Sequence, residues 1–212
     1  MMNKTERFWD NRASNFEKQP IKDEQAFQNM IEKVKSYLSA TDTVLDYGCG
    51  TGTISNLIAE NVKKIHAIDI SSKMIAFATQ KAAALDIDNI QHSKTTLFDN
   101  TLDTVQFDAV LAFNILHLSE DLQAVMQRIN QLLKAEGLLI STTPCLRTRF
   151  SMMGMVDLFL RKLGIVPNLK MPAITELETA IRNADFAIVA LEKPDFGSLD
   201  CFLVAKKLKA GQ

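Results

Sequence analysis

The sequence predicts an α/β protein with a doubly wound, mostly parallel, seven-stranded sheet, helices on both faces and an antiparallel hairpin at the C-terminal end. Three observations lead to this fold class. Short apolar runs of buried-strand length alternate with longer segments of helical spacing. The first of these runs leads directly into a glycine-rich turn. The chain finishes with two further strand-like runs around a turn signal.

Four apolar runs are predicted as parallel strands, because they show little alternation of polar and apolar residues and therefore suit strands covered on both faces. They are Thr43–Asp46, Lys64–Ile70, Phe107–Ala112 and Leu138–Thr142. Between them, apolar residues recur at helical spacing in three sets: Ile54, Leu57 and Ile58; Met74, Ile75, Ala78 and Ala82; Leu122, Val125, Ile129, Leu132 and Leu133. This rhythm implies right-handed crossovers in an open sheet.

The last part of the chain changes character. A helix is expected over Ile174–Ala184, and strands are expected over Phe186–Leu191 and Leu199–Ala205. Phe196, Gly197 and Ser198 form a turn signal between these strands, which predicts the antiparallel hairpin. With no internal repeat and no low-complexity linker, residues 1–212 are expected to form one domain.

Composition narrows the class of function. The formal net charge is −1, so the basic excess that proteins use to grip nucleic acid phosphates is missing. The three cysteines and three histidines are scattered, which gives neither a disulfide framework nor the spacing of metal ligands. No apolar run approaches the roughly 20 residues of a membrane span, and the polar N-terminus does not resemble a signal peptide. We therefore expect a cytoplasmic protein with no bound metal and no stable membrane insertion.

The most specific signal is the turn after the first strand. Gly48, Gly50 and Gly52 alternate with other residues, and Asp46 precedes them by two positions. Glycine lets the backbone turn sharply and lets a ligand approach closely, and the following helix start offers free N–H groups. Asp46 would repel a pyrophosphate but would favour a cationic ligand. Asp69 ends the second strand, where a carboxylate can accept both hydroxyls of a ribose. The pattern predicts a site for a nucleoside with a cationic tail.

These residues resemble the class I, Rossmann-like S-adenosylmethionine-dependent methyltransferases, and the similarity runs over most of the chain. Phe107–Ala112 resembles the family's fourth strand, and Phe8–Phe16 resembles an N-terminal helix that covers the cofactor in many small-molecule members, here expected over about residues 4–38. The resemblance implies S-adenosylmethionine as cofactor and S-adenosylhomocysteine as product. It implies these cofactor-binding residues: Trp9, Asp46, Gly48, Gly50, Gly52, Asp69, Ile70, Met74, Thr96, Leu97 and Asn114. Thr96 departs from the acid that the family normally has at that position.

Methyl transfer is an in-line displacement at a carbon already activated by positive sulfur, so positioning and exclusion of water can supply much of the acceleration. A base is needed only for an acceptor whose proton has a high pKa. His117 follows the fourth strand and is the candidate general base. A pocket-wall role without proton transfer is the alternative for this histidine.

The segment Asn114–His117 lacks both the Pro-Cys motif of RNA cytosine methyltransferases and the Asn/Asp-Pro-Pro-Tyr/Phe motif of enzymes that methylate exocyclic or amide nitrogens. Together with the near-neutral charge, this favours a small-molecule acceptor and no nucleic acid partner. The Met-rich segment of about 145–172 is interpreted as a core helix, as a lid over an apolar acceptor, or as a membrane-surface or homodimer contact. Two rival functions stay open: a non-catalytic S-adenosylmethionine-binding protein and a NAD-dependent oxidoreductase.

Overall fold

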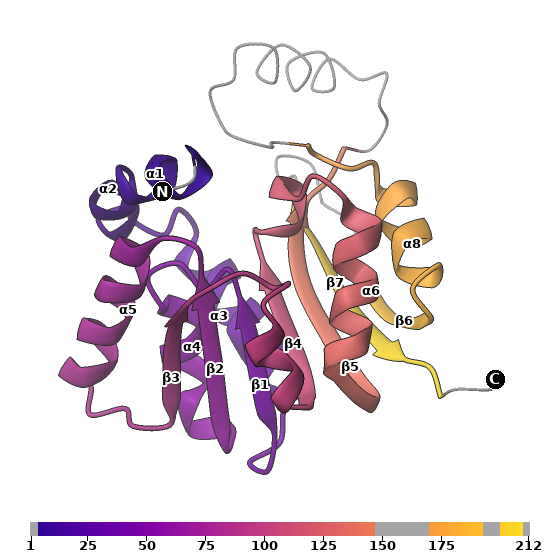
Figure 1. Cartoon of the computed structure of the whole chain (residues 1–212), viewed down its shortest axis with the longest axis horizontal. Coiled ribbons are helices and arrows are strands. Elements are labelled where there is room, and N and C mark those ends of the chain that lie inside the picture. Colours follow the sequence, from indigo (N-terminus) through magenta and orange to yellow (C-terminus); the bar gives the residue numbers. More distant parts are fainter. Residues whose placement is uncertain (1–3, 147–169, 193–199, 210–212) are drawn as a thin grey trace. The chain divides into compact units, whose positions relative to one another are not determined.

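The computed structural model describes residues 4–146, 170–192 and 200–209 (Figure 1). Most of the Met-rich segment lies outside these ranges, as does the turn at 196–198, so the expectations for both stay predictions. The described chain forms two compact units, Met1–Asp99 and Asn100–Gln212.

The predicted fold class is confirmed. The seven strands form a mixed sheet in the order β3-β2-β1-β4-β5-β7-β6, flanked by helices. The parallel pairs described are β1 with β2, β2 with β3 and β4 with β5. The antiparallel pairs are β5 with β7 and β6 with β7, which confirms the predicted C-terminal pair.

The first unit contains three strands, with helices before the first strand and between the strands. Its elements are α1 (Lys4–Asp10), α2 (Ala13–Glu17), α3 (Glu24–Lys35), β1 (Thr43–Tyr47), α4 (Thr53–Ile58), the 3₁₀ turn η1 (Ala59–Asn61), β2 (Lys64–Asp69), α5 (Ser72–Ala84) and β3 (Ile90–Lys94). Val44, Leu45, Ile65 and Ile68 are buried, as expected for strands covered on both faces. Ser71 begins α5 by accepting a hydrogen bond from the Met74 N–H, a standard helix N-cap.

The single N-terminal helix expected over about 4–38 is three helices in the structure. Pro20 follows α2 by three residues, and proline disfavours helical geometry in the residue before it. Asp23 then starts α3, because its side chain accepts a hydrogen bond from the Ala26 N–H at 2.9 Å.

Strand β3 was not predicted as a separate element. Its sequence, Ile-Gln-His-Ser-Lys, is polar, and none of its five residues is fully buried. It nevertheless pairs in parallel with β2 from Ile90 to Lys94. Backbone pairing with β2 thus outweighs the weak strand signal of its side chains.

The second unit holds the other four strands. Its elements are the 3₁₀ turns η2 (Asn100–Thr104) and η3 (Leu116–Leu118), the helices α6 (Leu122–Leu132) and α8 (Ile174–Arg182), and the strands β4 (Phe107–Phe113), β5 (Leu133–Pro144), β6 (Phe186–Glu192) and β7 (Asp200–Lys207). Within this unit α6 and α8 lie side by side (Figure 1).

Strand β5 begins at Leu133, earlier than the predicted Leu138. Leu133 pairs with Phe107 and Leu138 with Ala109, so the strand bulges between these two points. Glu136 lies in this bulge with a φ of 64°, a left-handed conformation that glycine adopts more easily. The sequence pattern missed this start because the bulge interrupts the apolar run.

None of the helices within the described ranges is long and apolar enough to cross a membrane.

Candidate functional site

The glycine loop joins β1 to α4. Gly48, Gly50 and Gly52 have φ values of 73°, 54° and 78°, a region that side-chain-bearing residues rarely occupy. At Gly52 a β-carbon would also lie 2.9 Å from the β-carbon of Ala78. The N–H groups of Gly48 and Cys49 donate to the Ile68 carbonyl of β2 at 2.9 and 3.0 Å, so the loop is fixed to the neighbouring strand.

Asp46 is the buried carboxylate before this loop. Its side chain is nearly inaccessible and accepts a hydrogen bond from the Ser55 hydroxyl of α4. Burial raises the pKa of Asp46 to about 6, and the charge of Asp69 adds to that rise against the lowering effect of Ser55. The carboxylate is therefore mostly ionised at neutral pH, and a positively charged ligand nearby would stabilise its charge.

Asp69 ends β2 and contacts the glycine loop directly. One carboxylate oxygen accepts the Gly50 N–H at 3.1 Å, and the other accepts the Ser71 N–H at 2.8 Å. Burial raises the pKa of Asp69, and these two backbone hydrogen bonds oppose the rise. Each carboxylate oxygen can accept a second hydrogen bond. The Asp69 carboxylate can therefore accept two further hydrogen bonds from the hydroxyl groups of a ligand.

The residues expected around an adenine differ in accessibility. Ile70 is half-buried and Thr96 is exposed, whereas Met74 and Leu97 belong to the core of the first unit. Met74 and Leu97 therefore offer a ligand little surface unless neighbouring side chains move. The Thr96 carbonyl accepts the Asp99 N–H at 3.2 Å, which closes a tight turn after β3.

The N-terminal helices α1 and α2 pack against α5. The Trp9 ring stands edge-to-face against Phe8, with 5.1 Å between ring centres. Phe16 lies over the glycine loop, since a β-carbon on Gly50 would be 3.5 Å from the Phe16 ring. Phe16 was not predicted as a site residue, and only its place in the Phe8–Phe16 motif could have indicated it.

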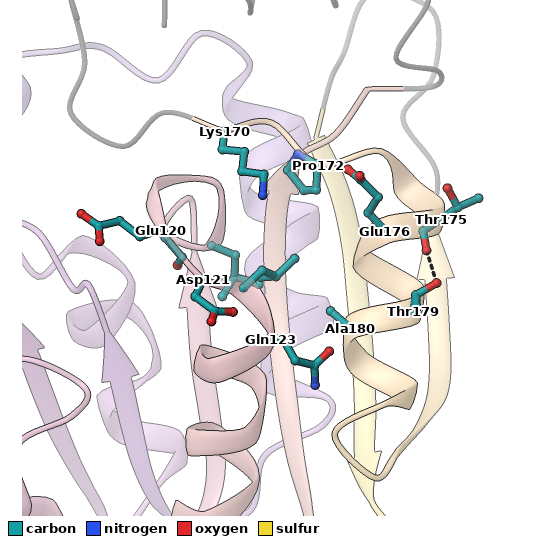
Figure 2. A pocket seen from close by; sticks show the side chains of 12 residues that line it. Glu120, Asp121, Gln123, Lys170, Pro172, Thr175, Glu176, Thr179 and Ala180 are labelled. Atoms are coloured by element: carbon teal, nitrogen blue, oxygen red, sulfur yellow. Dashed lines mark hydrogen bonds between the residues drawn. The ribbon is translucent and has the colours of Figure 1, made fainter.

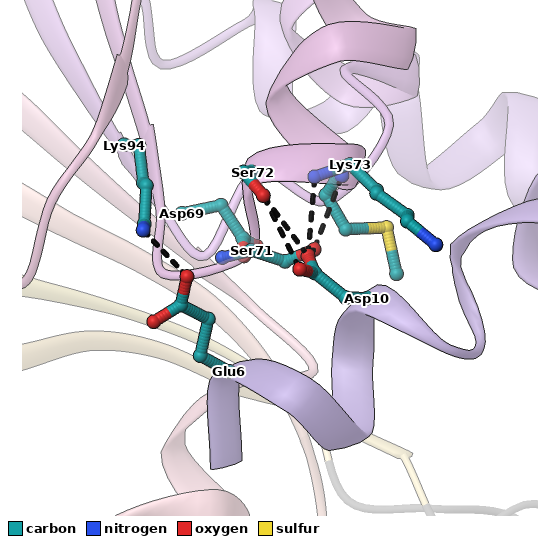
Figure 3. Close-up of polar contacts among 8 residues, drawn as sticks. Glu6, Asp10, Asp69, Ser71, Ser72, Lys73 and Lys94 are labelled. Atoms are coloured by element: carbon teal, nitrogen blue, oxygen red, sulfur yellow. Dashed lines mark hydrogen bonds and ion pairs between the residues drawn. The ribbon is translucent and has the colours of Figure 1, made fainter. Parts of the chain in front are cut away.

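Asp10 is a second residue that the sequence did not single out for the site. It is 6% exposed, and its carboxylate accepts hydrogen bonds from the start of α5 (Figure 3). Burial acts to raise the pKa of Asp10, but hydrogen bonds from Ser71, the Lys73 N–H and Ser72 outweigh it and lower the pKa. Asp10 is therefore a stably charged group next to the residues that hold Asp69.

The two remaining predicted site residues, Asn114 and His117, belong to the second unit. Asn114 has a φ of 53°, and its N–H donates to the Thr142 carbonyl of β5 at 2.9 Å. This backbone N–H is therefore already engaged within the sheet and is not available to the cofactor that the resemblance implies for Asn114.

His117 lies in the 3₁₀ turn η3. Its carbonyl accepts the Lys170 N–H at 2.7 Å, and its Nδ1 atom is buried without a hydrogen-bond partner among the described residues. Burial lowers the pKa of His117 to about 4, so the imidazole is neutral at physiological pH but is a weak base.

The second unit also contains a hollow of about 610 Å³ between the starts of α6 and α8 (Figure 2). Polar and apolar side chains both line it: Leu116, Ser119, Glu120, Asp121, Leu122, Gln123, Lys170, Pro172, Thr175, Glu176, Thr179 and Ala180. Ser119 and Gln123 are among them, and their buried Oγ and Nε2 atoms have no hydrogen-bond partner in the described part of the chain. Unsatisfied buried polar groups of this kind can bind a ligand or water.

No group of three or more histidine, cysteine, aspartate or glutamate side chains that could hold a metal ion occurs within the described ranges.

In the first unit, a glycine turn follows one parallel strand and a carboxylate at the end of the next strand accepts a hydrogen bond from that turn. This arrangement defines the Rossmann-like class of nucleotide-cofactor-binding α/β proteins. Residues 38–193 match the family described as a methyltransferase domain, so the chain belongs to that family.

Individual relatives agree with this assignment. An uncharacterised methyltransferase of Schizosaccharomyces pombe is 32% identical over 102 residues, which are 45% of this chain and 36% of that protein. The chain spans less than half the length of the first curated relatives it matches.

Solved structures share the fold at low sequence identity. The N-methyltransferase NodS from Bradyrhizobium japonicum, in complex with S-adenosylhomocysteine, is 16% identical with a TM-score of 0.72, covering 98% of this chain and all of NodS. The [4+2]-cyclase SpnF is 17% identical with a TM-score of 0.72, covering 90% of this chain and 85% of SpnF.

Proposed function

We propose that this chain binds S-adenosylmethionine and transfers its methyl group to a small-molecule acceptor, as one methyltransferase domain. The observation that carries the proposal is Asp69, a carboxylate at the end of β2 that is hydrogen-bonded to the glycine loop through Gly50. Membership of the methyltransferase family and the S-adenosylhomocysteine complex of NodS support it.

The residues of the first unit suit this cofactor. Asp69 would accept the ribose hydroxyl groups, and the glycine loop would lie along the methionine portion because no β-carbon obstructs it. Asp46 and Asp69 give the site a negative charge, which favours a ligand that carries an ammonium and a sulfonium group and disfavours the pyrophosphate of NAD. When bound, S-adenosylmethionine supplies a methyl group activated by positive sulfur.

The chain's own contribution to the reaction is positioning. An in-line displacement needs donor and acceptor held in one orientation away from water, and the fixed loop provides rigid contacts for the donor. The low pKa of His117 makes it a weak base, so we favour an acceptor that loses its proton easily or loses it after transfer.

A small molecule is the acceptor class we favour. The formal net charge of −1 argues against a nucleic acid surface. The hollow in the second unit lies within the usual size range of small-molecule pockets. A cytoplasmic location and a homodimer remain part of the proposal on sequence grounds alone.

The test is calorimetric titration of the purified chain with S-adenosylmethionine, S-adenosylhomocysteine and NAD. We expect binding of both sulfur compounds and none of NAD. Binding of neither sulfur compound would contradict the proposal. Release of S-adenosylhomocysteine with a panel of small acceptors then separates an enzyme from a binding protein, a distinction that matters because the fold also occurs in a [4+2]-cyclase.

A further inference from the structure

Three polar contacts fasten the N-terminal helices to the rest of the first unit. Glu6 of α1 forms an ion pair with Lys94 of β3 at 2.5 Å, and Glu17 of α2 forms one with Lys81 of α5 at 3.0 Å. The third contact is Asp10, which lies between them in sequence and is the buried one of these three carboxylates. Figure 3 shows the Glu6 and Asp10 contacts side by side.

Asp10 is held by several donors at the start of α5. Its Oδ1 accepts the Ser71 hydroxyl at 2.6 Å and the Lys73 N–H at 3.1 Å, and its Oδ2 accepts the Ser72 hydroxyl at 3.2 Å. A carboxylate at a helix N-terminus also interacts favourably with the helix dipole. A buried charge with this many donors is a strong, specific contact rather than a surface ion pair.

Ser71 connects this contact to Asp69. Its hydroxyl donates to Asp10 and accepts the Met74 N–H at 3.1 Å, while its own N–H donates to Asp69 at 2.8 Å. Ser71 is completely buried, so these three hydrogen bonds leave it little freedom to move. A continuous series of hydrogen bonds therefore runs from Asp10 through Ser71 to Asp69.

We propose that Asp10 is a positioning residue for the cofactor: by docking α1 on Ser71 it fixes the orientation of Asp69, and cofactor binding in turn strengthens the docking of α1. The proposal rests on the proposed function, since it takes Asp69 as the ribose-binding carboxylate. The contact of Phe16 with the glycine loop supports it, because the same N-terminal segment then reaches both parts of the site.

Thermodynamic linkage makes the proposal testable from both ends. If docking of α1 raises cofactor affinity, cofactor binding must favour docking by the same factor. Trp9 precedes Asp10 and is the chain's only tryptophan, so its fluorescence anisotropy reports the docking of α1 without a label. S-adenosylhomocysteine is the probe, because it binds without turnover.

The experiment compares the full-length wild type with Asp10→Ala, Asp10→Asn and Ser72→Ala by calorimetry and by Trp9 anisotropy. Asp10→Ala should weaken S-adenosylhomocysteine binding roughly tenfold, a typical coupling between two linked contacts. It should also lower Trp9 anisotropy in the free protein. Ser72→Ala is the matched comparison, because it removes only the two longer contacts of the Ser72 hydroxyl with Asp10 and leaves the path through Ser71 intact; its affinity should fall clearly less than that of Asp10→Ala.

Asp10→Asn keeps the size and one acceptor oxygen, so it should give an intermediate affinity and covers the case in which Asp10→Ala does not fold. A merely structural role would lower the melting temperature of the Asp10 variants and leave the affinity of the folded protein unchanged, and that result would overturn the proposal. Failure of the wild type to bind S-adenosylhomocysteine would instead overturn the proposed function, and this inference with it.

Discussion

Replacing Asp69 by alanine is the most direct test of the cofactor site. The substitution removes the carboxylate that accepts the N–H groups of Gly50 and Ser71, and with it the proposed acceptor of the ribose hydroxyls. Two effects on stability oppose each other. Two backbone N–H groups lose their acceptor, which is unfavourable, but a half-buried charge with a raised pKa is also removed, which is favourable. We therefore expect a folded variant with a modest change in stability.

The effect on cofactor binding should be larger than the effect on stability, and it should always weaken binding. Hydrogen bonds to a charged group contribute about 1.5–3 kcal/mol. Because about 1.4 kcal/mol corresponds to a tenfold change, the dissociation constant for S-adenosylhomocysteine should rise roughly 10- to 150-fold. The assay is calorimetric titration at mildly alkaline pH, where the carboxylate of the wild type is charged despite its raised pKa.

Asp69→Asn serves as the matched variant. The amide keeps the shape and one acceptor oxygen, but its NH₂ group would face the N–H of either Gly50 or Ser71. It should therefore bind no better than Asp69→Ala despite the smaller change in volume. An affinity within about twofold of wild type for both folded variants would remove Asp69 from the site and refute the reasoning.

Three further predictions concern stability. Gly52→Ala should lower the free energy of unfolding by roughly 2 kcal/mol, because the residue has a φ of 78° and its new β-carbon would lie 2.9 Å from that of Ala78; urea denaturation measures this. Since the pKa of Asp46 is about 6 when folded and about 3.9 when unfolded, the folded state binds the extra proton between these values. The Asp46 contribution to stability is thus present at low pH and lost as pH rises through 6, by about 3 kcal/mol in all. The free energy of unfolding of Asp46→Asn should therefore rise relative to that of wild type from acid to neutral pH. A difference between the two that does not depend on pH would contradict this. Lys207→Met should destabilise the chain by about 1–3 kcal/mol, since its ammonium group donates to two carbonyls at the end of α6 at 2.6 and 2.8 Å, whereas the more exposed Lys206→Met should have little effect in the same thermal melts.

The parts of the structure that sequence reasoning predicted are those with strong local rules. Glycines at alternate positions after an apolar run require positive φ values, and all three have them. The carboxylate expected at the end of the second strand is Asp69, which ends β2, and the structure adds its hydrogen bond from the Gly50 N–H.

The features that were missed depend on contacts between distant residues. Asp10 is conspicuous only once α1 lies on the start of α5, because its partners are more than sixty positions away. The bulge at Glu136 depends on how β5 aligns with β4 rather than on any local pattern. Asp185 precedes β6 with a φ of 58°, a left-handed conformation that no local pattern in the sequence predicted. These features are therefore determined by tertiary packing and not by the local conformational propensity of the residues.

The polar side chains of β3, which made it hard to predict as a strand, also affect how readily the protein aggregates in concentrated solution. β3 is the last strand in the order, so one row of its backbone groups faces away from β2. An edge strand of this kind is a template for association between molecules, and charged side chains are the usual protection. Gln91 and Lys94 are exposed along it. Replacing them with valine would give a more conventional strand and, by the same token, a protein more prone to aggregate through that edge.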